Sequence, residues 1–184
     1  KKDKEKQHLL KQLISPFILR RTKAEVLDEL PEKTELIVPV ELSEEEMAIY
    51  ENIRTRTLSG LQSEKINPIE ALMALTKLRQ AACSPELVDK HLTIPSSKIR
   101  VFLELVSELK ENKHRALVFS QFTSFLALVR QALDKAGIEY LYLGGSVPAA
   151  QRKKLVETFQ NGDMPLFLIS LKAGGTGLNL TAAD

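Results

Sequence analysis

The distribution of hydrophobic residues divides the chain of 184 residues into two parts with different patterns. Up to about residue 95, apolar residues recur at helical spacing, and short extended pieces interrupt them. From Ser96 onward, short continuous apolar runs alternate with amphipathic segments of helical length. The pattern predicts a mainly helical first part, residues 1–95, followed by a separate domain, residues 96–184.

Four helices are predicted in the first part from their start and stop signals. An apolar stripe at helical spacing over residues 9–14 ends at Pro16. Residues 22–25 form a capping-box pattern, as do residues 43–46, where three glutamates also suit the positive end of a helix. The fourth helix begins at Asn67-Pro68, and its spacing predicts four inward-facing residues: Leu72, Leu75, Leu78 and Ala82.

One segment of the first part alternates as a strand does. In "ELIVPVEL", residues 35–42, the alternation points four side chains one way: Leu36, Val38, Val40 and Leu42. Pro39 has no N–H to donate to a neighbouring strand. The segment is therefore either an edge strand or an isolated linker.

The second part predicts strands at "RALVFSQF", "IEYLYL" and "PLFLISL", separated by helices. The first strand is expected to be covered on both faces. The second and third of these helices should end at Gly137 and at Asn161-Gly162. The inward faces of the three helices include Phe102, Leu105, Val106, Leu109, Phe125, Val129, Leu155 and Phe159. Strands that alternate with helices of this length pair in parallel. The expected fold class is α/β, a parallel sheet flanked by helices.

Composition narrows the class of protein. Apolar residues make up 43% of the chain, enough for a packed core, and no apolar run reaches the length of a membrane span. The single cysteine, Cys83, cannot form an internal disulfide and fits a reducing compartment, where we expect it to be a small core residue. His8, His91 and His114 show no metal-ligand spacing with Cys83, so no metal site is expected.

Charge is unevenly distributed along the chain. The net charge is +2, yet residues 1–23 hold eight basic residues against Asp3 and Glu5, a local balance of +6. A basic arm favours a polyanionic partner, although a solvated helix end explains the same charges. The composition alone leaves both interpretations open.

A glycine-rich stretch, "LKAGGTGLNL", follows the last predicted strand. A nucleotide-binding Walker A loop needs its lysine after the glycines, whereas Lys172 precedes them and Leu178 follows Gly177. The spacing of the glycines also fails the dinucleotide fingerprint. By itself the stretch is either a tight turn or a place where the backbone approaches a ligand closely.

Six segments in order carry a family resemblance. "ISLKAGGTGLNLTAAD" resembles motif V of the Swi/Snf-related branch of helicase superfamily 2, and "RALVFSQF" resembles its motif IV. "YLGGSVPAAQRKKLVETFQ" and "SSKIRVFLELVSEL" are similar to two further segments of that family's second RecA-like lobe. "PFILRRTKAEVLDELPEK" and "LRQAACSP" resemble the connector between the lobes and the helical segment that precedes the second lobe.

The resemblance implies a piece of an ATP-driven translocase on double-stranded DNA that remodels protein–DNA complexes. Its ATP and Mg would be held mainly by a first RecA-like lobe, which is expected upstream, and the arginines of motif VI are expected downstream of Asp184. No catalytic residue is expected in residues 1–184, which should therefore be inactive alone. Expected partners are double-stranded DNA, the first lobe of the same protein and DNA-bound proteins, with no membrane; a sheet cut at residue 184 is also expected to self-associate.

The resemblance also implies roles for individual residues. Residues expected at the DNA backbone are Ser120, Gln121, Gly145, Ser146, Ser170 and Lys172, because hydroxyls, amides, backbone N–H groups and cations bind phosphate without reading bases. Residues expected to face ATP are Gly175, Gly177 and Asn179. Arg152 would either contact phosphate or fix its loop through a carboxylate. Arg20 and Arg21 would touch DNA or pair with acids of the connector.

Two other function classes remain as alternatives. One is a stand-alone α/β domain that binds a nucleotide or a sugar phosphate and has no motor. The other is a scaffold that keeps the fold without hydrolysing ATP. The compact connector favours a bacterial protein of the cytoplasm or nucleoid, and a eukaryotic one would be nuclear.

Overall fold

A computed structural model of the chain describes residues 3–19, 34–61, 68–175 and 177–183. The chain forms two compact units, Lys1–Val38 and Pro39–Asp184. The second unit contains the helices of residues 44–81 together with the sheet. The domain boundary near residue 95 stays a prediction about sequence modules, because the compact units divide at another position.

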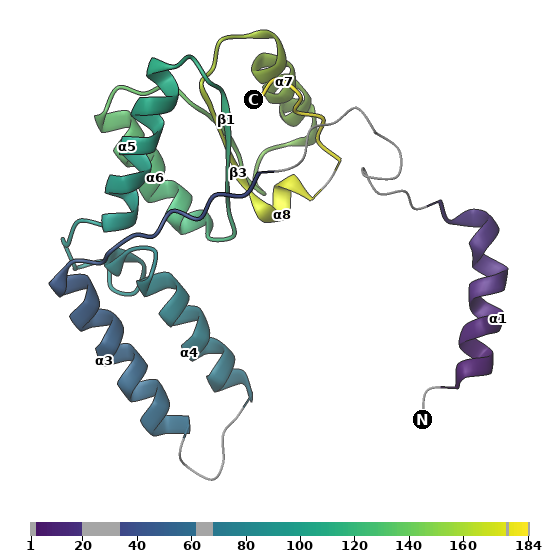
Figure 1. The fold of residues 1–184 in the computed structure, drawn as a ribbon, viewed down its shortest axis with the longest axis horizontal. Helices are drawn as coiled ribbons and strands as arrows, with labels where there is room; N and C mark the ends of the chain where they lie inside the picture. The colour runs from purple at the N-terminus through teal and green to yellow at the C-terminus, as the bar shows by residue number, and fades with distance from the viewer. Residues whose placement is uncertain (1–2, 20–33, 62–67, 176, 184) are drawn as a thin grey trace. The chain divides into compact units, whose positions relative to one another are not determined.

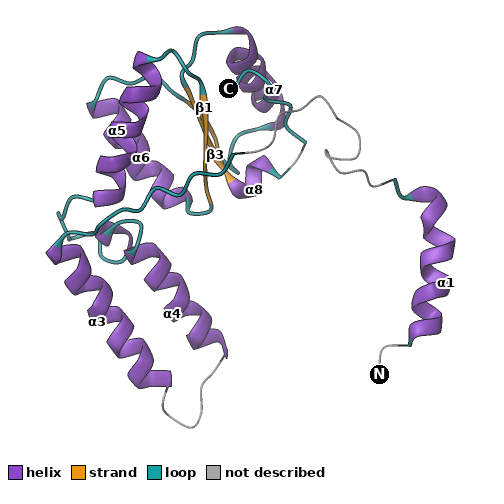
Figure 2. Ribbon diagram, in the orientation of Figure 1, coloured by secondary structure: helices purple, strands orange, loops and turns teal. Residues whose placement is uncertain are grey.

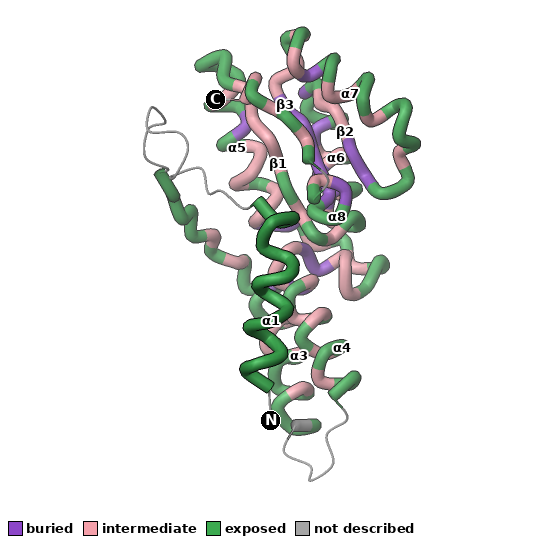
Figure 3. Tube along the Cα trace, turned by 90° about the vertical axis from the view of Figure 1, so that its right-hand side faces the viewer, coloured by how far each residue is buried: buried purple, intermediate pink, exposed green. Residues whose placement is uncertain are grey.

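The first unit contains helix α1 (Lys4–Ile14) and the 3₁₀ turn η1 (Ser15–Phe17). The Asp3 carboxylate caps α1 by accepting the Lys6 N–H at 3.4 Å, and Pro16 lies in the turn that follows the helix, as predicted. The apolar stripe is exposed along its length (Figure 3), with Leu9 and Leu13 58% and 62% exposed. The predicted helix is confirmed, but none of the described residues of its own unit, 3–19 and 34–38, buries the stripe.

The predictions for residues 20–43 have different outcomes. The capping box at residues 22–25 and the two arginines Arg20 and Arg21 lie outside the described residues. Residues 34–43 form no strand, and Leu36 is 84% exposed. Of the two alternatives for this segment, the structure shows the linker.

Helices α3 (Glu44–Leu61) and α4 (Pro68–Ala81) form an antiparallel hairpin at the start of the second unit (Figure 1), followed by the turn η2 (Pro85–Leu87). The prediction that Leu72 and Leu75 face inward is wrong, because they are 66% and 55% exposed. Leu78 and Ala82 are half-buried. Since α4 packs along α3 alone for most of its length, only one of its faces is covered.

Three parallel strands form the sheet, β1 (Ala116–Ser120), β2 (Leu141–Leu143) and β3 (Leu166–Ser170), in the order β1–β3–β2. The predicted parallel pairing is confirmed. All five residues of the central strand β3 are buried. The expectation that "RALVFSQF" is covered on both faces is wrong in part: β1 lies at an edge of the described sheet, and Phe119 is 49% exposed.

Helices cover both faces of the sheet (Figure 2). Leu166 and Leu168 of β3 pack with α5 (Ser97–Glu111) and α6 (Thr123–Lys135), and Phe167 and Ile169 pack on the opposite side with α7 (Ala149–Asn161) and α8 (Leu171–Gly174). Successive residues of a strand point to opposite faces, so one strand serves two cores. Leu105 was predicted to face inward but is 39% exposed.

A buried carboxylate joins the hairpin to the sheet domain. Glu46 is 2% exposed and accepts the Ser43 N–H at 2.9 Å, while Ser43 Oγ accepts the Glu46 N–H at 3.2 Å, which confirms the predicted capping box. The same carboxylate accepts the Ser97 N–H at 2.9 Å and the Ser97 hydroxyl. Beside it, the Ser96 hydroxyl donates to the Cys83 carbonyl oxygen at 2.7 Å. The first turns of α3 and α5 therefore share one anion, whose charge suits both helix N-termini.

Candidate phosphate-binding edge

The three strands end side by side, because parallel strands present their carboxyl ends at one edge of a sheet. Ser120 pairs with Ser170, and Leu143 pairs with Ile169, so Gly144 and Gly145 leave the sheet next to Ser170. We call this side the carboxyl edge and the opposite side the amino edge. Ligands of open parallel α/β sheets bind outside the carboxyl ends of the strands. The topology therefore gathers the predicted site segments from the ends of all three strands.

The end of β1 provides a hydroxyl and an amide. The Ser120 hydroxyl oxygen accepts the Phe122 N–H at 3.2 Å and so shapes the turn into α6. Gln121 is exposed, and its Oε1 accepts a hydrogen bond at 2.6 Å from Nη2 of Arg79, at the end of α4. The amide oxygen is thus engaged, which leaves the Gln121 NH₂ group to act as a donor.

Arg152 of α7 holds the loop that follows β2. Arg152 Nε donates to the Val147 carbonyl oxygen at 2.9 Å, and Nη2 donates to the Gly145 carbonyl oxygen at 3.4 Å. Arg152 thus fixes its loop through backbone carbonyls and not through the expected carboxylate, and its contact with phosphate stays a prediction. Ser146 remains exposed at the top of the loop.

The end of β3 differs from the prediction. The predicted strand included Leu171, but the strand ends at Ser170 and α8 begins at once. The Ser170 side chain is 2% exposed, and its Oγ accepts the Ala173 N–H at 3.3 Å as the N-cap of α8. Lys172 is exposed in the first turn of α8. Ser170 therefore acts on the turn that presents Lys172.

The three glycines of the loop have three different surroundings. A Cβ at Gly174 would lie 3.1 Å from the Ile169 side chain and 3.2 Å from the Phe119 ring, so this glycine allows close packing. Gly175 has ordinary backbone geometry and room for a side chain. Gly177 has φ +52°, the left-handed region that glycine adopts without steric penalty.

Asn179 points outward beyond these glycines. Its neighbours Leu178 and Leu180 pack into the core beneath α7, which leaves Asn179 exposed between them. Gln160 of α7 holds the following residues, because its Oε1 accepts the Ala182 N–H at 2.8 Å and its Nε2 donates to the Thr181 hydroxyl at 3.0 Å. The backbone around Asn179 is therefore anchored although its side chain is exposed.

The sequence did not reveal one cation beside this edge, Arg79. Burial raises the pKa of the Cys83 thiol, and the positive charges of Lys98 and Arg79 act in the opposite direction. Arg79 lies in the segment "LRQAACSP", but the resemblance of that segment implied no role for it, and by itself it is an ordinary basic residue in the last turn of a helix. Only the packing of the hairpin brings it next to Gln121.

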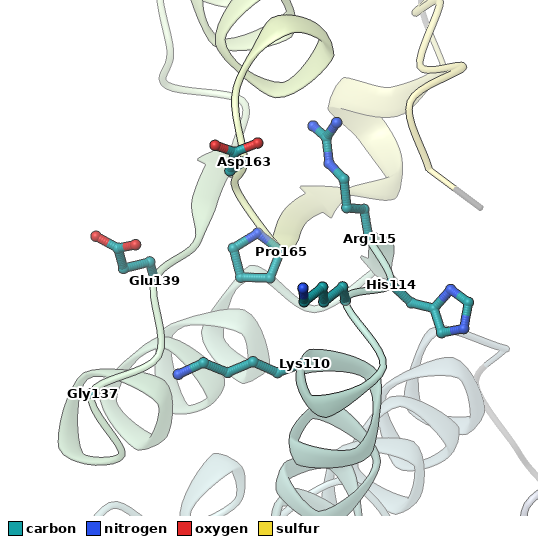
Figure 4. A pocket seen from close by; sticks show the side chains of 8 residues that line it. Lys110, His114, Arg115, Gly137, Glu139, Asp163 and Pro165 are labelled. Carbon is teal, nitrogen blue, oxygen red and sulfur yellow. The ribbon is translucent and has the colours of Figure 1, made fainter.

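The amino edge carries a different hollow (Figure 4). Its lining comes from the three segments that lead into the strands, with Lys110, Lys113, His114 and Arg115 before β1, Gly137 and Glu139 before β2, and Asp163 and Pro165 before β3. Basic and acidic side chains are mixed here. The carboxyl ends of α5 and α6 also face this side, and their partial negative charge suits Lys110 and Lys113.

Within residues 3–19, 34–61, 68–175 and 177–183, no cluster of three or more His, Cys, Asp or Glu side chains is arranged to hold a metal ion. In the same ranges, no helix combines the length and the apolar character that crossing a bilayer requires.

Sequence comparisons agree with the order of these elements. Residues 1–87 match the model of the SNF2-related domain, and residues 97–184 match that of the helicase conserved C-terminal domain. A chromodomain-helicase-DNA-binding protein 1-like of Danio rerio is 37% identical over 95% of this chain and 18% of its own length. A putative ATP-dependent helicase/translocase of Bacillus subtilis is 36% identical over 100% of this chain and 21% of its own length. The chain thus spans about a fifth of these relatives.

Solved structures extend the likeness to the fold. The Sulfolobus solfataricus SWI2/SNF2 ATPase core in complex with dsDNA is 28% identical, with a TM-score of 0.75 over 96% of this chain and 39% of that one. The core domain without DNA aligns with the same score over all of this chain. The parallel sheet, the helices that flank it and both family models agree. The chain belongs to the SNF2-related family of helicases and contains its RecA-like helicase C-terminal region.

Proposed function

We propose that residues 1–184 are the connector and second RecA-like lobe of an ATP-dependent translocase on double-stranded DNA that remodels protein–DNA complexes. The observation that carries this proposal is the convergence of the site segments at the carboxyl edge, with Ser120 and Ser170 in register. The dsDNA complex of the similar SWI2/SNF2 core supports it. DNA-bound proteins and the first lobe of the same protein are the further partners.

The DNA contacts are assigned to the polar groups of the carboxyl edge. Ser120, Gln121, Gly145, Ser146 and Lys172 bind phosphates of the backbone, and Ser170 acts by capping the turn that presents Lys172. Such contacts fix the position of a protein on DNA without reading its sequence. Arg152 supports them from beneath by holding the loop of Gly145 and Ser146.

The ATP contacts are assigned to Gly175, Gly177 and Asn179. Exposed backbone at the two glycines and an exposed amide at Asn179 suit a nucleotide, since they offer hydrogen bonds to phosphate and ribose oxygens. Residues 171–183 contain no carboxylate, so this loop fits the nucleotide and does not fit Mg. When bound, ATP supplies the energy for translocation, and Mg is held by the first lobe. The chain alone is then inactive.

The test uses the chain of 20.6 kDa, isotopically labelled for NMR. Duplex DNA should perturb the amides of Ser120 to Phe122, Gly145, Ser146 and Lys172, and an ATP analogue should perturb those of Gly175, Gly177 and Asn179. In anisotropy titrations, Lys172→Ala should weaken duplex binding and lower its salt slope by about one, from an affinity in the non-specific range of about 10⁻⁴ to 10⁻⁶ M. Lys110→Ala, which removes a cation at the amino edge, is the matched control.

Three outcomes would contradict the proposal. If Lys110→Ala and Lys172→Ala reduce duplex binding equally, the carboxyl edge is not the DNA surface. If Lys172→Ala abolishes nucleotide binding but leaves duplex binding unchanged, the DNA and ATP contacts of the loop are assigned the wrong way round. If a nucleotide or sugar phosphate binds tightly and duplex DNA does not bind, the chain is a stand-alone ligand-binding domain.

A further inference from the structure

Arg79 connects the α3–α4 hairpin to the carboxyl edge. Among the described residues of the hairpin, it alone forms a side-chain hydrogen bond to a residue that follows a strand at that edge, Gln121. It lies in the last turn of α4, and its Nη2 is 2.6 Å from Oε1 of Gln121. The same guanidinium lies 5.6 Å from the centroid of the Phe122 ring. These two contacts connect α4 to the turn between β1 and α6, across 42 residues of sequence.

No carboxylate of the described ranges neutralises the charge of Arg79. Within the described ranges, Arg79 forms no ion pair, whereas Arg54 and Arg100 pair with glutamates of their own helices at 2.8 and 3.0 Å. Arg79 is exposed, and no described carboxylate lies within ion-pair distance of it. The surface around Gln121 is therefore positive, which favours a phosphate ligand over a carboxamide or hydroxyl ligand.

The position of Arg79 is fixed before any ligand arrives. The Phe122 ring supports the guanidinium, and the Ser96 hydroxyl holds the carbonyl of Cys83, four residues after Arg79. Glu46 fixes the base of the hairpin through Ser97. A side chain that is already ordered loses less entropy on binding than a free one.

Gln121 gains a defined orientation from the same contact. Its amide oxygen faces the guanidinium, so its NH₂ group is turned away from Arg79. A guanidinium has five N–H donors, and the bond to Gln121 uses one of them. Arg79 and Gln121 together thus present donors from two elements toward the same side of the sheet.

We propose that Arg79 binds a phosphate of duplex DNA together with Gln121, and so extends the DNA-binding surface of the carboxyl edge onto the helical hairpin. This inference rests on the proposed function of that edge. It assigns to the hairpin a direct part in DNA binding, and it adds a second side-chain cation to Lys172.

The test is a salt titration of a labelled duplex with the 184-residue chain and four variants. Arg79→Gln removes the charge, Arg79→Lys keeps the charge but not the planar contact, and Lys172→Ala reports on the edge itself. Arg56→Gln, an exposed arginine on α3, removes the same charge elsewhere on the hairpin. Each phosphate contact contributes about 0.9 to the slope of log K against log salt, or about eightfold in affinity over a tenfold change in salt.

We expect Arg79→Gln to lower the slope by about 0.9 and to weaken binding by about fivefold to tenfold at 0.1 M salt, equally for duplexes of different sequence. Arg79→Lys should keep most of the slope, and Arg56→Gln should keep all of it.

If Lys172→Ala lowers the slope while Arg79→Gln behaves as the wild type, this inference fails and the proposed function stands. If neither variant changes binding, the proposed function fails as well. A third outcome is that Arg79→Lys and Arg79→Gln bind the duplex equally weakly and both keep the salt slope of the wild type. In that case Arg79 only orients Gln121, and the inference is wrong.

Discussion

The two edges of the same sheet use charge in different ways. At the carboxyl edge, cations such as Arg79 and Lys172 stand beside hydroxyls, an amide and glycines, and the described part of the chain gives neither cation a carboxylate partner. At the amino edge, Lys110 and Lys113 share a hollow with Glu139 and Asp163. Arg115 there lies 4.5 Å from the Phe159 ring centroid and donates from Nε to the Met164 carbonyl oxygen at 3.3 Å.

The difference separates two kinds of positive charge. Cations of the amino edge lie at helix ends, against an aromatic ring or among acids, so folding already supplies their partners. The cations of the carboxyl edge are exposed, and no carboxylate in the described part of the chain pairs with them. The second arrangement is the one that binds an external anion, and this distinction can be tested at three places.

The largest effect is expected from Glu46, which holds the hairpin, and therefore Arg79, at the carboxyl edge. Glu46→Ala leaves the N–H groups of Ser43 and Ser97 and the Ser97 hydroxyl without their common acceptor. The free energy of unfolding should fall by about 2–4 kcal/mol, measured by chemical denaturation. Glu45→Ala, the exposed neighbour, should change it by less than about 0.5 kcal/mol. Equal effects of the two variants would contradict the shared-anion geometry.

The contribution of Glu46 should also depend on pH. Burial acts to raise the pKa of this carboxyl, but hydrogen bonds from Ser97 and Ser43 outweigh it and hold the pKa below the ordinary value of 4.5. A lowered pKa means stabilisation that is present above the ordinary pKa and lost as the pH falls through the folded-state value. The difference in stability between the wild type and Glu46→Gln should therefore shrink below about pH 4.5. A constant difference from neutral to acidic pH would exclude this origin.

An intermediate effect is expected at the amino edge, where α5 and α6 end in the same way. Lys113 and Gly137 have φ of 59° and 65°, and in both helices the next residue donates its N–H five residues back, His114 to Leu109 and Ile138 to Leu133. Only the glycine adopts this conformation without strain. Gly137→Ala should lower the free energy of unfolding by about 1 kcal/mol, and Lys113→Gly should raise it by up to about 1 kcal/mol.

The control for this pair is Lys113→Gln, which removes the charge and keeps the strain. It should leave stability within about 0.5 kcal/mol of the wild type. Neither Lys113 variant should change the salt slope of duplex binding, because the cations of this edge are structural. A lower slope would remove the proposed difference between the two edges.

The smallest effect concerns Cys83, the one cysteine of the chain, which reports on Arg79. Burial raises the pKa of its thiol above the ordinary value of 9.0, against the opposing charges of Lys98 and Arg79. Alkylation should therefore reach half its maximal rate above pH 9.0, and Arg79→Gln should move that midpoint further up, as followed by intact mass. Arg100→Gln, at an exposed arginine paired with Glu104, should leave it in place. An unmoved midpoint in Arg79→Gln would place Arg79 away from the thiol.

Much of the fold followed from local signals in the sequence. Apolar runs between amphipathic helices predicted the parallel sheet, and Gly137, Gly162 and the Ser43–Glu46 box marked helix ends where the structure has them. These signals are local because they depend on backbone conformation and on side chains a few residues away. For residues 35–42 the sequence left an edge strand and a linker open, and the structure has the linker, because alternation alone supplies no partner strand.

Inward faces were harder to predict than helices. The stripes of α1 and α5 have similar spacing, yet Val106 of α5 is buried whereas Leu13 of α1 is 62% exposed. Periodicity shows that a helix has an apolar face, but a second surface must cover that face for burial to stabilise it. Leu72 and Leu75 of α4 were misplaced for the same reason.

The sequence by itself determined the family, the parallel α/β fold and the residue types available at each strand end. The tertiary structure alone decided that Ser170 points inward as a cap, that Arg152 supports a loop, and that Glu46 serves two helices. It also decided that Arg79 meets Gln121 across 42 residues. Sequence motifs reflect how neighbouring residues set the local backbone conformation. Contacts between distant segments form only when packing brings those segments together. Most of the geometry of the carboxyl edge depends on such contacts.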